Sequence, residues 1–308
     1  MYLNINRVEY VITNLCTGQC KHCSVGNRIK DKGHLQYERM TEVLSKLCDR
    51  YTIHSVMCFG GEPLLYPKEV EGIMREATSC NIPKRQLITN GYFSKKQAVI
   101  SDVAASLKDS GLNDILLSVD AFHQETIPLE PVYEFARQTR EHNLPIRLHP
   151  AWVVDPEHEN KYNRRTRQVL DRFEDLKFPQ SKGNNIFPSG KAIEFLSEYF
   201  PAKRIDLSIR CGQEPYSSRL DDVNTISIAP NGDVYVCSFI IGNVYREDIN
   251  TIIDRYNPYE IPEMKALLDD GIQGLIDYAA SKGVTIDLAE HYSICGICRA
   301  LVDKLAIF

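Results

Sequence analysis

The sequence lacks any long apolar run, and this absence limits where the protein can act. None of its hydrophobic stretches approaches the ~20 residues of a membrane-spanning helix. The first residues, 1–7, have no apolar core of the kind found in signal peptides. The formal net charge is only −5, which gives no electrostatic reason to expect nucleic acid or an anionic membrane as a partner. We therefore expect a cytoplasmic protein with neither partner.

Internal repeats and low-complexity linkers are also missing from the 308 residues. Cysteine, in contrast, is abundant: the chain has ten. In a reducing cytoplasm, grouped cysteines indicate metal binding or catalysis rather than disulfides. Three lie outside the groups. Cys48 and Cys80 occur in helical patterns and are expected to be buried, whereas Cys58 lies on a predicted strand.

Short β-like runs alternate with helical patterns over the first 190 residues. This alternation predicts right-handed crossovers and a parallel sheet. Six units are too few for a closed eight-stranded barrel, so we predict an α/β fold with a partial (β/α)6 TIM-like barrel and a site at the carboxyl ends of its strands. The predicted strands are 8–14, 54–59, 85–90, 114–119, 145–153 and 184–188, and the predicted helices are 36–50, 67–80, 94–110, 128–142 and 159–175.

The pattern changes after Gly190. Two β-like runs flank Asn231-Gly232, a strong hairpin signal. We interpret residues 1–200 as the barrel and residues 201–308 as a smaller α+β module packed against it. The predicted elements of this part are helix 192–200, strands 223–229 and 233–240, and a helical tail over 248–283.

Three cysteines near the start, Cys16, Cys20 and Cys23, have C-x3-C-x2-C spacing in one short loop. Thiolates so close together can surround a single centre, and they prefer iron–sulfur clusters, zinc or Cu(I). Zinc needs a fourth ligand, for which His22 is available but lies inside the same loop. Three ligands leave one corner of a four-iron cluster open, and an open position is typical of a catalytic centre.

Polar or glycine residues follow several predicted strands. Gly60 and Gly61 allow the backbone to approach a ligand closely, although an ordinary strand-to-helix turn would also explain them. Residues two apart share one face of a strand, so Ser118 with Asp120, and Arg147 with His149, are expected to point into the barrel together. The full set at strand ends is Gly60, Gly61, Glu62, Pro63, Asn90, Ser118, Asp120, Arg147 and His149, with His123 as a further ligand or a loop cap.

The C-terminal part has four grouped cysteines, two of them in a C-x2-C pair. Four thiols make a closed site, and their spacing alone fits either structural zinc or an iron–sulfur cluster. They are Cys211, Cys237, Cys295 and Cys298.

The loop of Cys16, Cys20 and Cys23, followed after one βα unit by Gly60–Pro63, resembles the cluster motif of the radical SAM enzymes. The aromatic position before the third cysteine holds His22. The resemblance implies a 4Fe–4S cluster on the three cysteines, with S-adenosylmethionine (SAM) on its open iron. It also implies that Gly60, Gly61, Glu62, Pro63, Asn90, Ser118, Asp120 and Arg147 bind SAM or substrate.

The stretch Asn231–Cys237 resembles the hairpin of the twitch module, a shortened relative of the SPASM domain. That resemblance implies that Cys211, Cys237, Cys295 and Cys298 hold one auxiliary 4Fe–4S cluster. The radical SAM resemblance further implies reductive cleavage of SAM to a 5′-deoxyadenosyl radical, hydrogen abstraction from a substrate carbon, and an external reductant such as flavodoxin or ferredoxin.

The resemblance leaves the substrate open. A ribosomally made peptide that is epimerised or cross-linked is favoured over a sugar-like alcohol that is dehydrogenated. A non-enzymatic zinc or iron–sulfur protein is the alternative of another class. If Cys58 faces the barrel interior, it can donate a hydrogen atom to a substrate radical, although packing is the simpler role for a buried cysteine.

Overall fold

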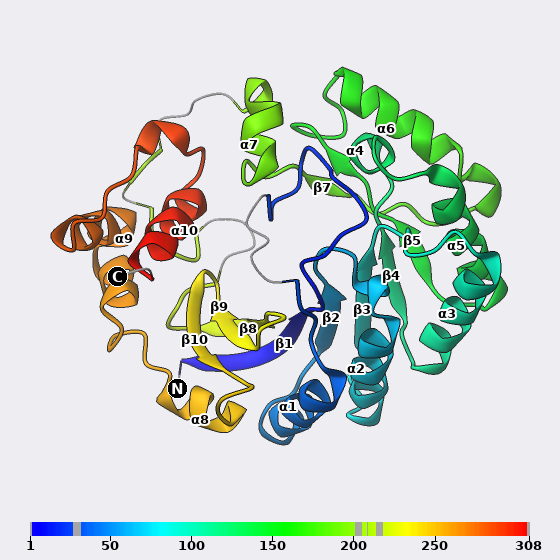
Figure 1. The fold of residues 1–308 in the computed structure, drawn as a ribbon. Coiled ribbons are helices and arrows are strands. Elements are labelled where there is room, and N and C mark those ends of the chain that lie inside the picture. The colour runs from blue at the N-terminus through cyan, green and yellow to red at the C-terminus, as the bar shows by residue number, and fades with distance from the viewer. Residues whose placement is uncertain (1, 27–31, 201–204, 208, 214–217, 307–308) are drawn as a thin grey trace.

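A computed structural model describes residues 2–26, 32–200, 205–207, 209–213 and 218–306. One curved sheet of eight strands, in the order β10-β9-β8-β1-β2-β3-β4-β5, runs through the molecule with helices on its outer side (Figure 1). Strands β1 to β5 pair in parallel, so the predicted α/β partial barrel is confirmed. These strands are β1 (Leu3–Val11), β2 (Ser55–Phe59), β3 (Lys84–Thr89), β4 (Asp114–Leu117) and β5 (Ile146–Leu148).

The outer face of these strands is apolar. Tyr10 of β1 and Cys58 of β2 are paired in register and are completely buried in the main core. Five of the six connecting helices contribute buried residues to that core, as amphipathic helices do. The buried residues of the shortest, Ala121 and Phe122, belong to a second, smaller cluster. The helices are α1 (Tyr37–Arg50), α2 (Pro67–Ser79), α3 (Gln97–Asp109), the short α4 (Ala121–Gln124), α5 (Leu129–Glu141) and α6 (Lys161–Asp171).

The inner face of the same strands carries a row of polar side chains. Arg7 donates to Glu9 at 2.8 Å and to Gln86 at 3.0 Å. Gln86 in turn donates to Asp114 at 2.7 Å, and Arg147 donates to the same carboxylate at 2.8 and 3.0 Å. This row satisfies the polar groups inside the barrel, as buried polar groups require. Arg147 is therefore held by Asp114 inside the sheet.

The predicted strand 145–153 is divided in the structure. It breaks at His149-Pro150, because proline has no N–H for the ladder, and continues as β6 (Ala151–Trp152). That strand pairs in parallel with β7 (Asn184–Asn185) in a separate two-stranded sheet. The sixth barrel position is thus present but shorter than the predicted strand 184–188.

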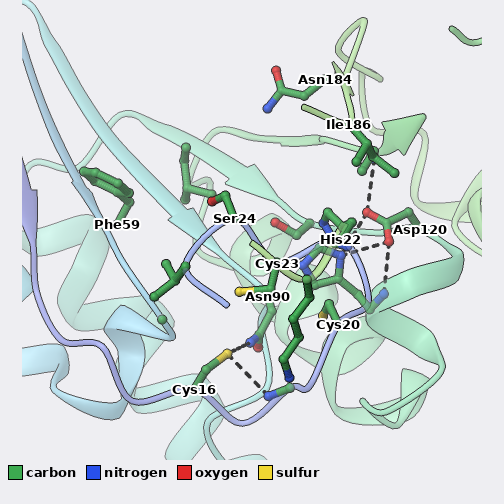
Figure 2. Close-up of a pocket in the computed structure, with 18 of the residues that line it drawn as sticks. Cys16, Cys20, His22, Cys23, Ser24, Phe59, Asn90, Asp120, Asn184 and Ile186 are labelled. Carbon is green, nitrogen blue, oxygen red and sulfur yellow. Dashed lines mark hydrogen bonds and ion pairs between the residues drawn. The ribbon is translucent and has the colours of Figure 1, made fainter. Parts of the chain in front are cut away.

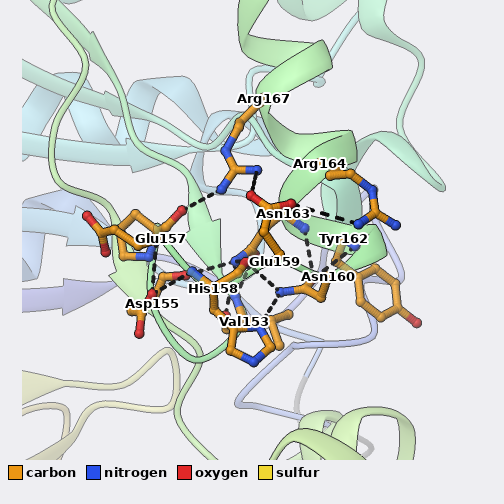
Figure 3. A network of polar contacts seen from close by, with 11 residues as sticks. Val153, Asp155, Glu157, His158, Glu159, Asn160, Tyr162, Asn163, Arg164 and Arg167 are labelled. Atoms are coloured by element: carbon orange, nitrogen blue, oxygen red, sulfur yellow. Dashed lines mark hydrogen bonds and ion pairs between the residues drawn. The ribbon is translucent and has the colours of Figure 1, made fainter.

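The segment between β6 and α6 is held by one buried side chain (Figure 3). The Asn163 amide accepts from the N–H of Val153 at 2.9 Å and donates to the carbonyls of Val153, Asp155 and His158. These bonds hold Val154 at a φ of 67°, which is rare for a β-branched residue. The basic residues of α6 lie on its outer side, where Arg167 pairs with Glu159 at 3.0 Å.

The C-terminal part continues the barrel sheet. Strand β8 pairs in parallel with β1, and β9 and β10 follow in antiparallel order. The turn at Asn231-Gly232 is present as predicted, with Gly232 at a φ of 86°. The predicted strand 233–240 is wrong, because Cys237 and Ser238 form a second two-residue turn. The elements are β8 (Val223–Ile228), β9 (Asp233–Val236), β10 (Phe239–Asn243), α7 (Lys191–Leu196), α8 (Ile249–Arg255), α9 (Pro262–Ser281) and α10 (Ile294–Leu305).

The division into modules at residue 200 stays a prediction, and residues 201–204 lie outside the described residues. The shared sheet joins the two parts through the β1–β8 pair. None of the helices in the described part of the chain has the length and hydropathy needed to cross a bilayer.

Candidate metal and cofactor site

A cavity of about 480 Å³ opens at the carboxyl ends of the barrel strands. Its volume lies in the range of small-molecule and cofactor sites. Cys16, Cys20 and Cys23 lie in its wall, with Asn184 and Ile186 on the opposite side (Figure 2). The three sulfurs predicted to act together therefore face one space.

The start of the cysteine loop rests on the turn after β2. The N–H of Gly61 donates to the carbonyl of Thr13 at 2.7 Å, and the N–H of Glu62 donates to that of Leu15 at 2.7 Å. A Cβ atom on Gly61 would lie 2.1 Å from the Leu15 carbonyl oxygen, which no other residue tolerates. Gly60 and Gly61 line the cavity as predicted, but their lack of side chains is explained by this contact between two backbones.

The end of the cysteine loop is held from the other side of the cavity. The N–H of Lys191, at the start of α7, donates to the carbonyl of Cys23 at 3.0 Å. Gly190 has a φ of 57°, and a Cβ atom there would lie 2.4 Å from the same carbonyl oxygen. The loop is therefore fixed at both ends by backbone contacts.

The cysteines of this loop differ in exposure: Cys20 is buried, Cys23 is half-buried and Cys16 is exposed. Burial raises the pKa of Cys16 and of Cys20, because a low dielectric disfavours the thiolate. A bound cationic centre would reverse this effect, since metal coordination deprotonates a thiol. The donor set thus fits a metal centre.

The sulfur spacing argues against one zinc ion. Ligands at ~2.3 Å around a tetrahedral zinc lie about 3.8 Å from one another. Among the described residues, one group places three candidate ligand atoms within 4.8 Å of one another: His22, Asp120 and His123. No three cysteine sulfurs of the described residues lie that close together. Three thiols spaced more widely than the ligands of one zinc ion can instead surround a larger centre, such as a 4Fe–4S cluster.

Asp120 lines the cavity, but protein donors occupy its carboxylate. It accepts from the N–H groups of Phe122 and His123 at 3.0 Å, from that of Ala151 at 3.1 Å, and from the His123 ring at 2.8 Å. Burial alone would raise the pKa of Asp120, but the adjacent His123 and these donors lower it well below its usual value. The structure therefore places Asp120 as a cap of α4 that orients His123.

Glu62 points away from the cavity. Its fully buried carboxylate accepts from Leu64 N–H at 2.9 Å, from Thr89 Oγ1 at 2.7 Å and from Asn90 N–H at 2.8 Å. Burial raises the pKa of Glu62 to about 7. Pro63 is buried beside it at the start of a short 3-10 helix, Pro63–Leu65. Both residues shape the site without lining it.

Two further predicted site residues, like Glu62 and Pro63, do not line the cavity. Cys58 is completely buried in the core, whereas its neighbour Phe59 lines the cavity, because successive residues of a strand face opposite sides. Cys58 is thus not placed to meet a substrate. Arg147 is held by Asp114 within the sheet and also does not line the cavity. Asn90 and Ser118 do line it, as predicted.

Residues after β5 and in β7 complete the wall. His149 shares a short hydrogen bond with Ser181 at 2.7 Å and a second with Asn184 at 2.9 Å. Sequence reasoning singled out His149 but missed Asn184 and Lys191. The one sequence feature that pointed to Asn184 as a site residue was its position at the start of a predicted strand. No sequence feature pointed to Lys191.

The four C-terminal cysteines also meet around one small cavity. Cys237 occupies the β9–β10 turn with a φ of 54°. Cys295 and Cys298 lie three residues apart in the first turn of α10, on one face of the helix. Burial and the three neighbouring thiols raise the pKa of Cys298, whereas the N-terminus of a helix favours the thiolates that a metal requires.

Comparison with known sequences identifies one family. Residues 10–149 match the model of the Radical SAM superfamily. Two curated relatives are the GTP 3',8-cyclases of Moorella thermoacetica, 28% identical over 123 residues, and of Desulforamulus reducens, 28% identical over 126 residues. The matches cover 39% and 40% of this chain but only 36% and 37% of those proteins.

Solved structures with a similar fold cover more of the chain. Streptococcus suis SuiB bound to S-adenosylmethionine aligns with a TM-score of 0.57 at 14% identity, over 94% of this chain and 77% of that one. Native anSMEcpe with bound AdoMet aligns with a TM-score of 0.53 at 15% identity, over 80% of both chains. At such identities the likeness concerns the fold alone.

Proposed function

Residues 10–149 form a radical SAM domain, and on this premise we propose that the protein cleaves SAM and abstracts a hydrogen atom from a substrate carbon. When bound and reduced, a 4Fe–4S cluster in such a site supplies the electron that splits SAM into methionine and a 5′-deoxyadenosyl radical. Cys16, Cys20 and Cys23 would hold that cluster. The observation that carries the proposal is their position with the Gly60-Gly61 turn in one cavity at the strand ends.

The residues of the chain would bind the cofactor, orient it against the substrate and shield both from water. The backbone contacts at Gly61 and Gly190 fix the cysteine loop. Ser118 and Asn90 offer polar groups to the cofactor side of the cavity. His149 and Asn184 lie on the other side, where a substrate would enter. Walls of this kind exclude water from reactive intermediates.

Metal analysis after anaerobic reconstitution tests this proposal. About eight irons per chain are expected, because two 4Fe–4S clusters contain that number. Addition of SAM and dithionite should then yield 5′-deoxyadenosine, measured by chromatography. Bound zinc without any SAM cleavage would instead identify a metalloprotein of another class.

We further propose that the substrate is a peptide, and the free edge of β7 supports this. The N–H groups of Asn184 and Ile186 donate to the carbonyls of Pro150 and Trp152, so the N–H and carbonyl of Asn185 between them face the opposite edge. In the described sheets no strand pairs with that edge. Asn185 lines the cavity, and Phe187 beside it is 45% exposed. An extended peptide can add to such an edge by backbone hydrogen bonds.

A nucleoside triphosphate, as the names of the curated relatives suggest, fits the cavity less well. Triphosphates are held by several arginines or lysines. Of the described residues that line the cavity, Lys191 is the one that carries such a charge. A sugar-like alcohol needs no cation and remains the second candidate, with His149 and Asn184 as hydrogen-bonding partners.

Mass spectrometry in deuterated solvent separates these reactions. We expect the peptide encoded by a short open reading frame beside the gene to change in mass. One deuteron gained without other change indicates epimerisation, and two hydrogens lost indicate a cross-link. An unchanged peptide together with oxidation of a sugar-like alcohol would favour the dehydrogenase.

A further inference from the structure

Asn90 is one of the cavity residues that touch a cysteine of the first loop. Its side-chain amide nitrogen lies 3.6 Å from the Sγ atom of Cys16 (Figure 2). The same sulfur accepts from the N–H of Gly18 at 3.4 Å. Cys16 therefore has two N–H donors, one from its own loop and one from the end of β3.

The orientation of the Asn90 amide is determined by its surroundings. The N–H of Tyr92 donates to Asn90 Oδ1 at 2.8 Å, and a backbone N–H can only donate. The oxygen of the amide must therefore face Tyr92, which turns its NH2 group toward Cys16 and toward Thr17 Oγ1 at 3.2 Å. A rotated amide would break the Tyr92 bond.

The position of Asn90 is fixed in turn by Glu62. One oxygen of that buried carboxylate accepts from the Asn90 N–H at 2.8 Å, and the other accepts from Thr89 Oγ1 at 2.7 Å. Thr89 Oγ1 also accepts from the N–H of Gly91 at 2.9 Å. Three consecutive residues at the end of β3, Thr89 to Gly91, are thus held by hydrogen bonds, with the Asn90 side chain directed at Cys16.

We infer that Asn90 is a positioning residue that raises the reduction potential of the cluster on Cys16 through this hydrogen bond. The inference rests on the proposed cluster at Cys16, Cys20 and Cys23. Reduction adds negative charge, part of which lies on the ligand sulfurs, so an N–H donor at a sulfur stabilises the reduced form. Hydrogen bonds to cluster sulfurs are among the factors that set the potential.

Two variants remove the donor while preserving the shape of the side chain. Asn90→Leu deletes both polar atoms without adding charge. Asn90→Asp keeps the acceptor for Tyr92 but turns an oxygen toward Cys16. Both should move the midpoint potential of the first cluster to more negative values, and Asn90→Asp should move it further because its charge also opposes reduction.

The measurement is a dithionite titration of the reconstituted holoenzyme, followed by electron paramagnetic resonance. The signal of the first cluster is recognised by its change on addition of SAM, and a second cluster serves as an internal control. Asn184→Asp makes the same chemical change on the opposite wall, where Asn184 contacts His149 and no cysteine. In Asn184→Asp, the midpoint potential of the first cluster should stay close to that of the wild type.

Two results would overturn the inference. One is an unchanged potential in both Asn90 variants at full iron content. The other is loss of the first cluster from both variants, because the Asn90 amide would then be needed for cluster assembly and would not act on its reduction potential. If the wild-type protein itself bound no iron, the proposed function would fail instead, so the two failures are distinguishable.

Discussion

Replacing Cys16, Cys20 or Cys23 by alanine is expected to reduce 5′-deoxyadenosine formation to background. Each variant would remove one of the three thiols that we propose hold the first cluster, and the motif offers no fourth. The thiols also lie in one loop whose two ends are fixed by backbone contacts, so the loss of one sulfur leaves its corner of the centre without that ligand. Chromatography after anaerobic incubation with SAM and dithionite measures the effect.

Cys48→Ala provides the matched control for these variants. Cys48 is a partly buried cysteine of α1 that packs against the main core and does not line the cavity. Its replacement should leave the iron content and SAM cleavage as in the wild type. Equal activity in Cys16→Ala and Cys48→Ala would contradict a cluster on the first loop.

Replacing Cys295 by alanine should distinguish the roles of the two cysteine sites. The iron content should fall from about eight to about four per chain, because one of two 4Fe–4S clusters is lost. SAM cleavage should persist at least in part, since the first cavity contains none of the C-terminal cysteines. Product formation from the peptide should be lost if the second cluster takes the electron that hydrogen abstraction leaves on the substrate.

Iron analysis, 5′-deoxyadenosine yield and product mass should be measured on the same sample of Cys295→Ala. Full product formation at half the iron would show that the second cluster is structural. Eight irons retained would show that Cys295 is not a ligand.

The sequence predicted the elements whose signals are local. Alternating β-like and helical patterns indicated the parallel barrel, and the spacing of Cys16, Cys20 and Cys23 placed them in one loop. Asn231-Gly232 marked a turn that the structure contains. Each of these signals lies within a few residues of the feature that it predicts.

Features that depend on contacts between distant residues were beyond the sequence. Nearly all residues of β2 are buried, so its sequence shows no alternation of apolar and polar residues. The sequence therefore did not show which residues of β2 face the barrel interior, or that Cys58 faces the outer core. The partner of Arg147 is Asp114, 33 residues away on the next strand. The cavity wall at Asn184 depends on the pairing of β6 with β7, which two residues of sequence do not reveal.

The pairing of β8 with β1 has a consequence for how the two cysteine sites move. Strand β1 leads directly into the first cysteine loop, and β8 leads through β9 to Cys237. Strands paired in the middle of a sheet separate only when much of the fold unfolds. The sheet therefore acts as a rigid spacer between the two sites. The distance over which an electron would pass between the two sites is therefore expected to change little when a substrate binds.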